Sequence, residues 1–464
     1  MKKYLSVLLV LGLLTACSTS APVEKEDGVL EETPEVVDMH LEYAIDESLE
    51  ASIDDLWNQW MEDGTVPGGV VLAAKDGKII FEKAYGYAYL ADAKEESPYD
   101  APVYEKIDSP REMKVDTMFD LASVTKVMAT TQSVMKLISE GKLSVDDKVA
   151  TYIPGFEANG KGDITVAQLL THTSGLPQWE ATFLYCDTKE EQLEYIKQLK
   201  LNETFVQDGI DRKAHHYSDF SFMTLGFIVE AISGMDMDTY VEENIYKPLG
   251  MDHTCYNPLK KGFTKDQIAA TSLGNPYEYK MVDEELYPEF GYDCTKDKEA
   301  FEQFDGWRKE TLIGEVNDGN TGMGGKGIAG HAGLFSNAQD LAVLGEVLLN
   351  GGEYKGVKIY NQDTVNLFTS KQTNTGIESE EFGYAFKLDQ SWMGDSATEA
   401  VFGHDGFTGT YVTFDPVNHL QIIILTNKMQ SGFRTGENAN PNLYWNVGPL
   451  AKETANIIRT SLGI

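Results

Sequence analysis

Cysteine and basic residues are scarce in this sequence. The 464 residues include four cysteines, and three of them lie beyond the N-terminal segment, at Cys186, Cys255 and Cys294. These three are too few and too scattered for a disulfide framework or a zinc site, so we expect free thiols, with one disulfide as the alternative. Lys and Arg number 38 against 74 Asp and Glu, a net charge of -36. Because this charge repels nucleic-acid phosphates, the sequence predicts no nucleic-acid partner.

The hydrophobic run at the N-terminus is too short to span a membrane comfortably. Two lysines precede it, it ends at Leu14, and small residues follow up to Cys17. This pattern is typical of a signal peptide over residues 1–16. The stretch LTAC at its end resembles the processing box of bacterial lipoproteins, which implies that Cys17 receives a lipid and becomes the new N-terminus. Cleavage nearby by an ordinary signal peptidase, with release of the protein, is the alternative.

Residues 17–46 are acidic and contain two prolines and few aromatic side chains. This composition predicts a solvated tether. Two or more acyl chains on Cys17 would anchor the protein stably. We therefore expect a lipid-anchored protein on the extracytoplasmic face of a bacterial membrane, with its folded part held away from the lipid.

Both ends of the folded part predict antiparallel sheet and helices. Residues 49–60 place apolar side chains at helical spacing before a glycine. Residues 68–90 form two β-rich runs joined by Asp76-Gly77, a dipeptide that tolerates the positive φ of a hairpin turn. Residues 410–427 predict a second hairpin, and residues 450–462 predict a closing amphipathic helix.

The middle of the chain, residues 119–379, is predicted to be mainly helical with long loops. We therefore expect an α/β plus all-α fold. An antiparallel sheet flanked by helices forms one lobe from residues 47–118 and 380–464, and the helical lobe is inserted between these segments. A cleft between two lobes is a common position for a site. Within the insert, Ser336 and Gln339 predict a capping box for the helix that follows.

The stretch FDLASVTKVM, residues 119–128, contains Ser123 three residues before Lys126. On a helix these two side chains share one face. The same spacing recurs at Ser133 and Ser139, but Ser123 lies at the expected start of a helix, where unpaired N–H groups can stabilise an oxyanion. A lysine can take the proton of a serine only if burial or a neighbouring cation lowers its pKa.

Two further segments carry polar residues that a nucleophilic serine needs. Tyr217 comes just before a strongly apolar helix. His404 comes just before a strand, and Gly406 beside it allows close approach of the backbone to a ligand. In chain order these motifs resemble Ser-x-x-Lys, Tyr-x-Asn and Lys-Thr-Gly or His-x-Gly of the serine β-lactamase and penicillin-binding-protein superfamily, in the branch with class C β-lactamases and D-alanyl-D-alanine carboxypeptidases.

This resemblance, which runs from about residue 50 to the C-terminus, implies a β-lactamase/transpeptidase-like fold and a serine hydrolase. It implies that Ser123 is acylated, that Lys126 is its base and that Tyr217 passes a proton to the leaving group. His404 would line the substrate strand, and the N–H groups of Ser123 and Phe407 would form the oxyanion hole.

The resemblance implies a peptidoglycan peptide or ester as substrate and no cofactor, and we expect a monomer. The activity that we expect first is that of a D-alanyl-D-alanine carboxypeptidase or a muropeptide amidase. A related esterase is one alternative. A non-catalytic wall-binding or penicillin-sensing module is another. The remaining histidines lack metal-ligand spacing, so we expect no metal site and treat four of them as structural or surface residues: His172, His215, His216 and His331.

Two positions depart from the family pattern. Asp219 stands where asparagine is usual, and an ionised carboxylate accepts hydrogen bonds but donates none. His404 replaces a permanent cation, and Asp405 replaces a hydroxyl. With His404 largely neutral at pH 7, both departures weaken recognition of a terminal carboxylate. We therefore expect penicillins and D-Ala-D-Ala peptides to acylate this protein poorly.

Overall fold

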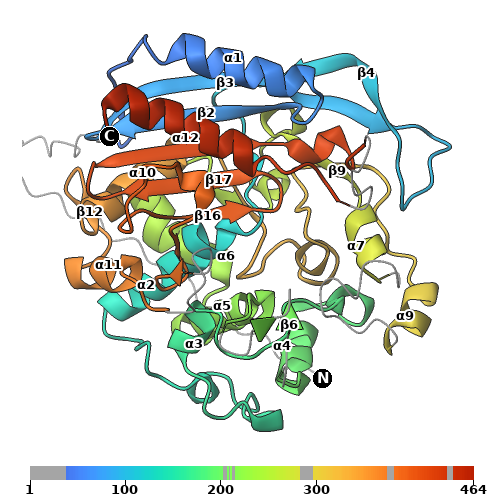
Figure 1. Ribbon diagram of the computed structural model, residues 1–464. Helices are drawn as coiled ribbons and strands as arrows, with labels where there is room; N and C mark the ends of the chain where they lie inside the picture. The colour runs from blue at the N-terminus through green and yellow to red at the C-terminus, as the bar shows by residue number, and fades with distance from the viewer. Residues whose placement is uncertain are drawn as a thin grey trace, which may run out of the picture. The chain divides into compact units, whose positions relative to one another are not determined.

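The computed structural model describes most of the chain after the N-terminal segment (Figure 1). The described residues are 38–201, 206–207, 210–211, 215–282, 296–373, 381–435 and 443–464. The expected signal peptide, Cys17, Cys294 and most of the expected tether lie outside them. Cys186 and Cys255 are buried free thiols.

Nine strands form the main sheet in the order β1-β3-β2-β18-β17-β16-β15-β14, with β4 also paired to β3. Every pairing is antiparallel except that of β1 with β3. The strands are β1 (Glu42–Tyr43), β2 (Gly68–Lys75), β3 (Lys78–Ala93), β4 (Tyr104–Glu112), β14 (Glu381–Phe382), β15 (Lys387–Leu388), β16 (Phe402–Gly406), β17 (Thr410–Asp415) and β18 (Leu420–Thr426). The predicted sheet from both ends of the chain is therefore confirmed, with one parallel pair at its edge.

The turn and the central pairing of this sheet follow from local sequence. Asp76 and Gly77 have φ of 51° and 75° and join β2 to β3, as the dipeptide predicted. β18 pairs along the whole of β2, so strands from the two ends of the chain lie side by side in the middle of the sheet (Figure 1). The sheet also begins earlier than expected, because β1 lies in the segment that we assigned to the tether.

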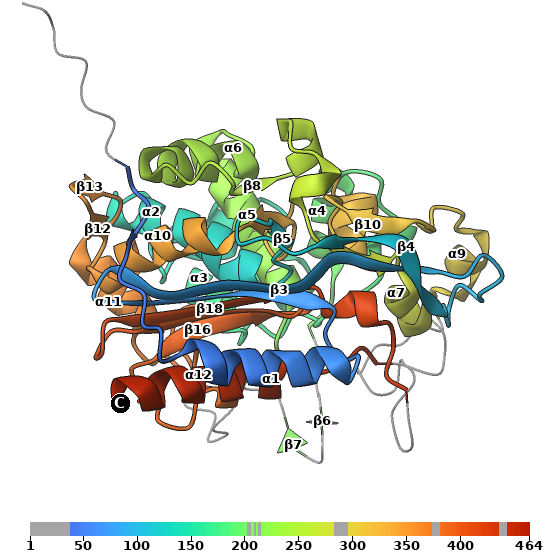
Figure 2. The same cartoon turned by 90° about the horizontal axis from the view of Figure 1, so that it is seen from above.

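Both faces of the central strands are buried. On β2, Val70 and Leu72 belong to one apolar cluster and Val71 and Ala73 to another, because successive side chains point to opposite faces. The helices α1 (Glu50–Glu62) and α12 (Gly448–Leu462) pack on one face, and most helices from the middle of the chain lie on the opposite side (Figure 2). The predicted terminal helices are confirmed.

The chain between β4 and β14 is rich in helices. They are α2 (Thr131–Ser139), α3 (Val166–Leu170), α4 (Lys189–Gln198), α5 (Asp219–Ser233), α6 (Met237–Val241), α7 (Pro276–Val282), α9 (Lys298–Gln303), α10 (Ala338–Leu349) and α11 (Gln362–Thr369). Short helical turns are η1 (Lys126–Thr130), η2 (Val149–Thr151), η3 (Ala158–Gly160), η4 (Thr182–Leu184), η5 (Glu242–Tyr246), η6 (Lys247–Leu249), η7 (Pro258–Lys261), η8 (Lys265–Gln267), η10 (Asn320–Gly324), η12 (Ser391–Met393) and η13 (Lys428–Ser431). The division into two lobes stays a prediction.

Short strands connect these helices. They are β5 (Phe119–Asp120), β6 (Val206–Gln207), β7 (Ile210–Asp211), β8 (Cys255–Tyr256), β9 (Ala270–Leu273), β10 (Thr311–Ile313), β11 (Leu334–Ser336), β12 (Glu353–Tyr354) and β13 (Val357–Lys358). No single helix among the described residues has the length and apolar character to cross a bilayer. The pair formed by α5 and Met237–Leu249 reaches this length and apolar character together, but the two members are bent by 73° relative to each other.

The predicted capping box of α10 is wrong by one residue. Asn337 is the N-cap, and its side chain accepts a hydrogen bond from the Asp340 N–H at 2.9 Å. Ser336 is still the last residue of β11, and its hydroxyl bonds to Thr254 Oγ1 at 2.7 Å. The strand therefore extends over the residue that the sequence pattern assigned to the cap.

Candidate active site

Ser123 lies in a tight turn between β5 and η1. Ala122 before it has a φ of 45°, a left-handed conformation that non-glycine residues rarely adopt. The Ala122 N–H donates to Asp120 Oδ1 at 2.9 Å, and the Lys126 N–H donates to the Ser123 carbonyl at 2.9 Å. The turn therefore sets Ser123 directly before the helical segment, as the sequence predicted.

The main sheet holds this turn in place. Thr408 Oγ1 donates to the Asp120 carbonyl at 2.7 Å, and Thr410 Oγ1 donates to the Leu121 carbonyl at 3.0 Å. Gly406 leaves the space for this contact, since a Cβ there would lie 2.4 Å from the Leu121 oxygen. The segments of the first and third motifs thus meet at Ser123.

Only one of the three Ser-x-x-Lys pairs joins its serine to its lysine in the described structure. Lys126 Nζ donates to Ser123 Oγ at 2.9 Å. The Ser133 hydroxyl donates to a backbone carbonyl one turn earlier, at 2.9 Å, and the Ser139 hydroxyl accepts from a backbone N–H at the start of α11, also at 2.9 Å. Ser123 is therefore the candidate nucleophile.

Lys126 is fully buried and ion-paired. Its Nζ lies 2.7 Å from Asp219 Oδ1 and donates to the His331 carbonyl at 3.1 Å. Burial, the largest single effect, disfavours the ammonium form, but the interactions with Asp219 and Tyr217 together outweigh it and raise the pKa of Lys126 above its ordinary value. The lowered pKa that a lysine base needs is not found in this state. Asp219 therefore compensates Lys126 as well as lining the cavity beside Ser123.

A second lysine, Lys387 on β15, was missed by the sequence analysis. Its Nζ lies 2.5 Å from Asp405 Oδ1, and β15 brings it to the site because Lys387 pairs with Gly403 of β16. The ammonium groups of Lys126 and Lys387 lie 5.0 and 5.6 Å from the centre of the Tyr217 ring. Two cations, each with its own carboxylate, thus flank the Tyr217 ring.

His404 is fully buried on β16 and neutral. Its Nδ1 lies 2.7 Å from the Asp405 carbonyl oxygen. Burial, and next the charge of Lys387, lower the pKa of His404 to about 3. A neutral ring at pH 7 agrees with the expectation from the sequence, and it means that His404 does not replace the cation of the family motif.

His172 supports Tyr217. The two rings stack with centroids 4.3 Å apart, and His172 Nδ1 accepts a hydrogen bond from the Ser218 N–H at 3.0 Å. Burial holds the pKa of His172 well below its ordinary value, so the ring is a neutral acceptor. Ser218 is the N-cap of α5, which also carries Asp219. The structural role expected for His172 is therefore one of positioning the site.

A cavity of about 290 Å³ opens beside Ser123. It combines aromatic, amide and acidic side chains, and its lining is Ala122, Ser123, Gln178, Trp179, Tyr217, Asp219, Tyr277, Glu278, Met281, Asn317, Asp318, His331, Ala332 and Phe407. The Ser123 and Phe407 N–H groups make no hydrogen bond within the described part of the chain. Their role as an oxyanion hole stays a prediction.

The pKa values of two carboxyl groups in this cavity are shifted in opposite directions. Asp318 Oδ1 lies 3.0 Å from His331 Nε2, and although burial opposes it, this contact lowers the pKa of Asp318. Glu278 accepts from the Gly319 N–H at 3.0 Å. Burial, and next the charge of Asp318, raise the pKa of Glu278 to about 7. Glu278 is therefore largely protonated in mildly acidic solution.

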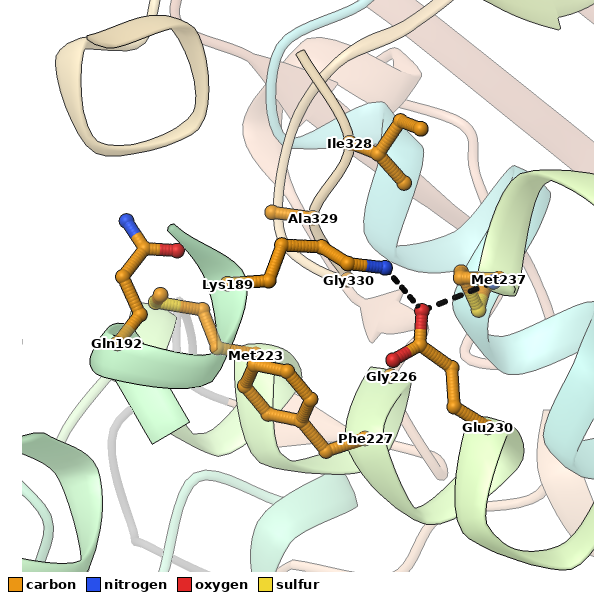
Figure 3. Close-up of a pocket in the computed structure, with 10 residues that line it drawn as sticks. All are labelled: Lys189, Gln192, Met223, Gly226, Phe227, Glu230, Met237, Ile328, Ala329 and Gly330. Atoms are coloured by element: carbon orange, nitrogen blue, oxygen red, sulfur yellow. Dashed lines mark hydrogen bonds and ion pairs between the residues drawn. The ribbon is translucent and has the colours of Figure 1, made fainter. Parts of the chain in front are cut away.

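A much smaller cavity, of about 10 Å³, lies between α4, α5 and the segment 328–330 (Figure 3). Lys189 Nζ and Glu230 Oε1 form an ion pair of 2.6 Å there. A Cβ on Gly330 would lie 2.0 Å from the Phe222 carbonyl oxygen, so this segment packs tightly on α5. The space has room for about one water molecule. The segment 328–330 directly precedes His331, whose carbonyl accepts a hydrogen bond from Lys126.

The Ser-x-x-Lys geometry predicts the result of three serine substitutions. Ser123→Ala should abolish covalent labelling by an activated ester, because it removes the only one of these hydroxyls that contacts its lysine. Ser133→Ala and Ser139→Ala should keep labelling within about twofold, since small polar changes away from a site have small effects. Intact-mass spectrometry measures the added acyl group, and circular dichroism checks folding. Full labelling of a folded Ser123→Ala protein would contradict the assignment.

The raised pKa of Glu278 predicts a pH-dependent stability. The folded state favours the neutral carboxyl, so this stabilisation is complete below the unfolded pKa of 4.5 and is lost as pH rises through about 7. Relative to Glu278→Gln, the wild type should lose about 3 kcal/mol of unfolding free energy between pH 4.5 and 8. Urea unfolding at both pH values measures it. The exposed Glu302→Gln variant is the control, and equal pH dependence in all three proteins would exclude a shifted Glu278.

Comparisons with known proteins agree with this geometry. The beta-lactamase family matches residues 53–443 of the chain. A protein of Escherichia coli (strain K12), named "Putative D-alanyl-D-alanine carboxypeptidase", is 36% identical over 459 residues and covers 95% of this chain and 93% of its own. An N-acetylmuramyl-L-alanine amidase of Bacillus subtilis (strain 168) is 37% identical over 393 residues, which is 82% of this chain and 80% of the amidase.

A solved class C beta lactamase has the same fold. Its TM-score is 0.58 at 18% sequence identity, with 92% of this chain and 99% of that chain covered. The β-lactamase-like fold expected from the motifs is therefore confirmed. Because the family match spans most of the chain and two relatives exceed 30% identity over more than two thirds of it, this chain belongs to the beta-lactamase family and is a serine hydrolase.

Proposed function

We propose that this serine hydrolase cleaves a peptidoglycan amide through an acyl-Ser123 intermediate. The favoured bond is the one between the lactyl group of muramic acid and L-alanine in a muropeptide. The names of the two relatives support peptidoglycan as the substrate class. The observation that favours the amidase over a D-alanyl-D-alanine carboxypeptidase is the charge around Tyr217, where Lys126 and Lys387 are each paired with a carboxylate.

This charge arrangement matters because of what lies beside the scissile bond. In a D-Ala-D-Ala terminus, the residue that carries the scissile nitrogen ends in a free α-carboxylate. In a muropeptide with a longer stem, the corresponding carbonyl belongs to a neutral amide. Lys126 and Lys387 are each neutralised by a carboxylate and His404 is neutral, so together they attract a substrate carboxylate weakly. A neutral amide brings no charge that these residues would have to balance.

The charges of the site also suggest the order of proton transfer. Because Lys126 holds its proton through Asp219, we assign the base to Tyr217, whose ring both ammonium groups flank. Tyr217 takes the Ser123 proton as Oγ bonds to the carbonyl carbon, and the N–H groups of Ser123 and Phe407 stabilise the oxyanion. Tyr217 then gives the proton to the leaving nitrogen as the C–N bond breaks.

Hydrolysis of the acyl-enzyme reverses these roles. Tyr217, again the base, takes a proton from water as the water oxygen bonds to the acyl carbon. The ester bond to Ser123 breaks, and Tyr217 returns the proton to Oγ. In this order of proton transfers, Lys126 is not the base that the family motif implies. Its ammonium group lies over the Tyr217 ring and donates a hydrogen bond to Ser123.

The substrate preference is tested with matched amides. The wild type should hydrolyse a muramyl-L-alanine amide whose alanine carboxyl is capped about tenfold faster, in kcat/KM, than the same compound with a free α-carboxylate, a difference of about 1.4 kcal/mol. Asp405→Asn leaves Lys387 without its carboxylate partner. The unpaired ammonium group should attract the free α-carboxylate, so the preference for the capped amide should fall below tenfold. Restoring a cation directly by His404→Lys is less suitable, because that position is fully buried. A wild type that strongly prefers the free carboxylate would refute this account.

We also propose that the protein is exported and anchored by a lipid on Cys17. The support is the sequence of residues 1–17, with its two lysines, short apolar run and LTAC box. An enzyme of the cell wall would act at the extracytoplasmic face, so this location and the proposed substrate are consistent with each other.

The anchor is tested by replacing the thiol. In a bacterial host with lipoprotein processing, Cys17→Ala should move the protein from the membrane fraction or leave its precursor unprocessed, because no acyl chains are attached. Cys186→Ala, which removes a buried free thiol, should leave the fractionation unchanged. Fractionation with intact-mass spectrometry measures both. Normal membrane association of Cys17→Ala would argue against lipidation.

A further inference from the structure

Lys428 lies at the rim of the Ser123 cavity, although it does not line it. It begins η13, directly after β18, and packs beside the turn that follows β16: a Cβ on Gly409 would lie 3.1 Å from Lys428 Cγ. Its Nζ lies 5.5 Å from the centre of the Phe407 ring. Phe407 lines the cavity and is 39% exposed, so the ring that Lys428 approaches belongs to the wall of the space beside Ser123.

The charge of Lys428 is not compensated. Among the described residues, no carboxylate lies within 4.0 Å of its Nζ, in contrast to Lys126 and Lys387. Burial lowers the pKa of Lys428 to about 8, with Asp405 opposing this shift and Arg434 adding to it. In a chain with a net charge of -36, a partly buried cation without a partner needs an explanation.

The surroundings of Lys428 fit a ligand that leaves the cavity over Phe407. The Phe407 ring contacts Tyr277 at 4.9 Å and Tyr444 at 6.0 Å between centroids, which builds an aromatic wall. Arg434 Nε donates to the Tyr444 carbonyl at 2.8 Å on the same wall. Lys428 and Arg434 therefore both contact this aromatic wall, in which Phe407 also lines the Ser123 cavity.

We propose that Lys428 is a substrate-binding residue that holds a carboxylate of the muropeptide stem, beyond the residue that carries the scissile nitrogen. This proposal rests on the proposed function and names a specificity determinant for it. A carboxylate at the scissile residue would lie in the cavity, whereas one that reaches Lys428 belongs to a later residue. A single ammonium near Asp405 suits a singly charged carboxylate better than a doubly charged phosphate.

The test compares two substrates in each protein. One is muramyl-L-alanyl-D-isoglutamine with its free side-chain carboxylate, and the other is the same compound with that carboxylate converted to an amide. The wild type should prefer the carboxylate about fivefold in kcat/KM, through KM, as expected for a partly exposed ion pair. Lys428→Met should bring this ratio to about one, and Lys428→Arg should retain it.

A matched control separates this role from a general loss of positive charge. Lys106 on β4 also lies over an aromatic ring, 5.0 Å from the centre of Tyr87, but Tyr87 does not line the cavity, whereas Phe407 does. Lys106→Met should keep the fivefold ratio. An equal loss of the ratio in Lys106→Met and Lys428→Met would overturn the proposal, because long-range charge would then explain it.

A second substrate pair separates this inference from the proposed function. Activated esters with and without a distal carboxylate on the leaving group require acylation of Ser123 but no amidase activity. If muropeptides are not hydrolysed while Lys428→Met removes the ester preference, the amidase proposal fails and the carboxylate site is supported. A wild type and a Lys428→Met protein with the same ratio for both substrate pairs would refute the role of Lys428.

Discussion

Lys126 and Asp219 form an ion pair beside Ser123, and the other contacts of the site hold these two residues in place. The tight turn at Ala122 and η1 position Lys126, and the His331 carbonyl accepts its second hydrogen bond. Asp219 begins α5, whose N-cap is tied to His172. Removing either charge would leave the other buried without a partner, at a cost of about 3–5 kcal/mol. This ion pair therefore favours the protonated form of Lys126, so that the proposed base for Ser123 is Tyr217.

The main sheet connects strands from both ends of the chain to the turn that contains Ser123. β18 is paired with β2 along its length, β17 is paired with β18, and the threonines after β16 bond to the carbonyls of Asp120 and Leu121. The nucleophilic turn is therefore held from outside its own helix. This explains how Ala122 keeps a left-handed conformation, which costs of order 1–3 kcal/mol.

The sequence predicted the parts of the site that have a local signal. Asp76-Gly77 defines a hairpin by backbone conformation, and Ser123, Tyr217 and His404 each stand in a recognisable motif. Lys387 and Glu278 have no such signal, because their roles depend on which strand or cavity lies beside them after folding. The raised pKa of Lys126 also depends on a partner that is distant in sequence, Asp219. The capping error at Ser336 arose because tertiary pairing extended a strand by one residue.

The short strands at the two ends of the main sheet affect how copies of the protein can associate. The strands at the two ends of the strand order, β1 and β14, are two residues long each, whereas β4 beside β3 is nine residues long. A strand from another molecule could form only a few backbone hydrogen bonds with β1 or β14. Growth of the sheet from copy to copy at these two strands is therefore disfavoured. An enzyme concentrated on a surface by an anchor would meet its neighbours often, and short edges of this kind let such encounters end without aggregation.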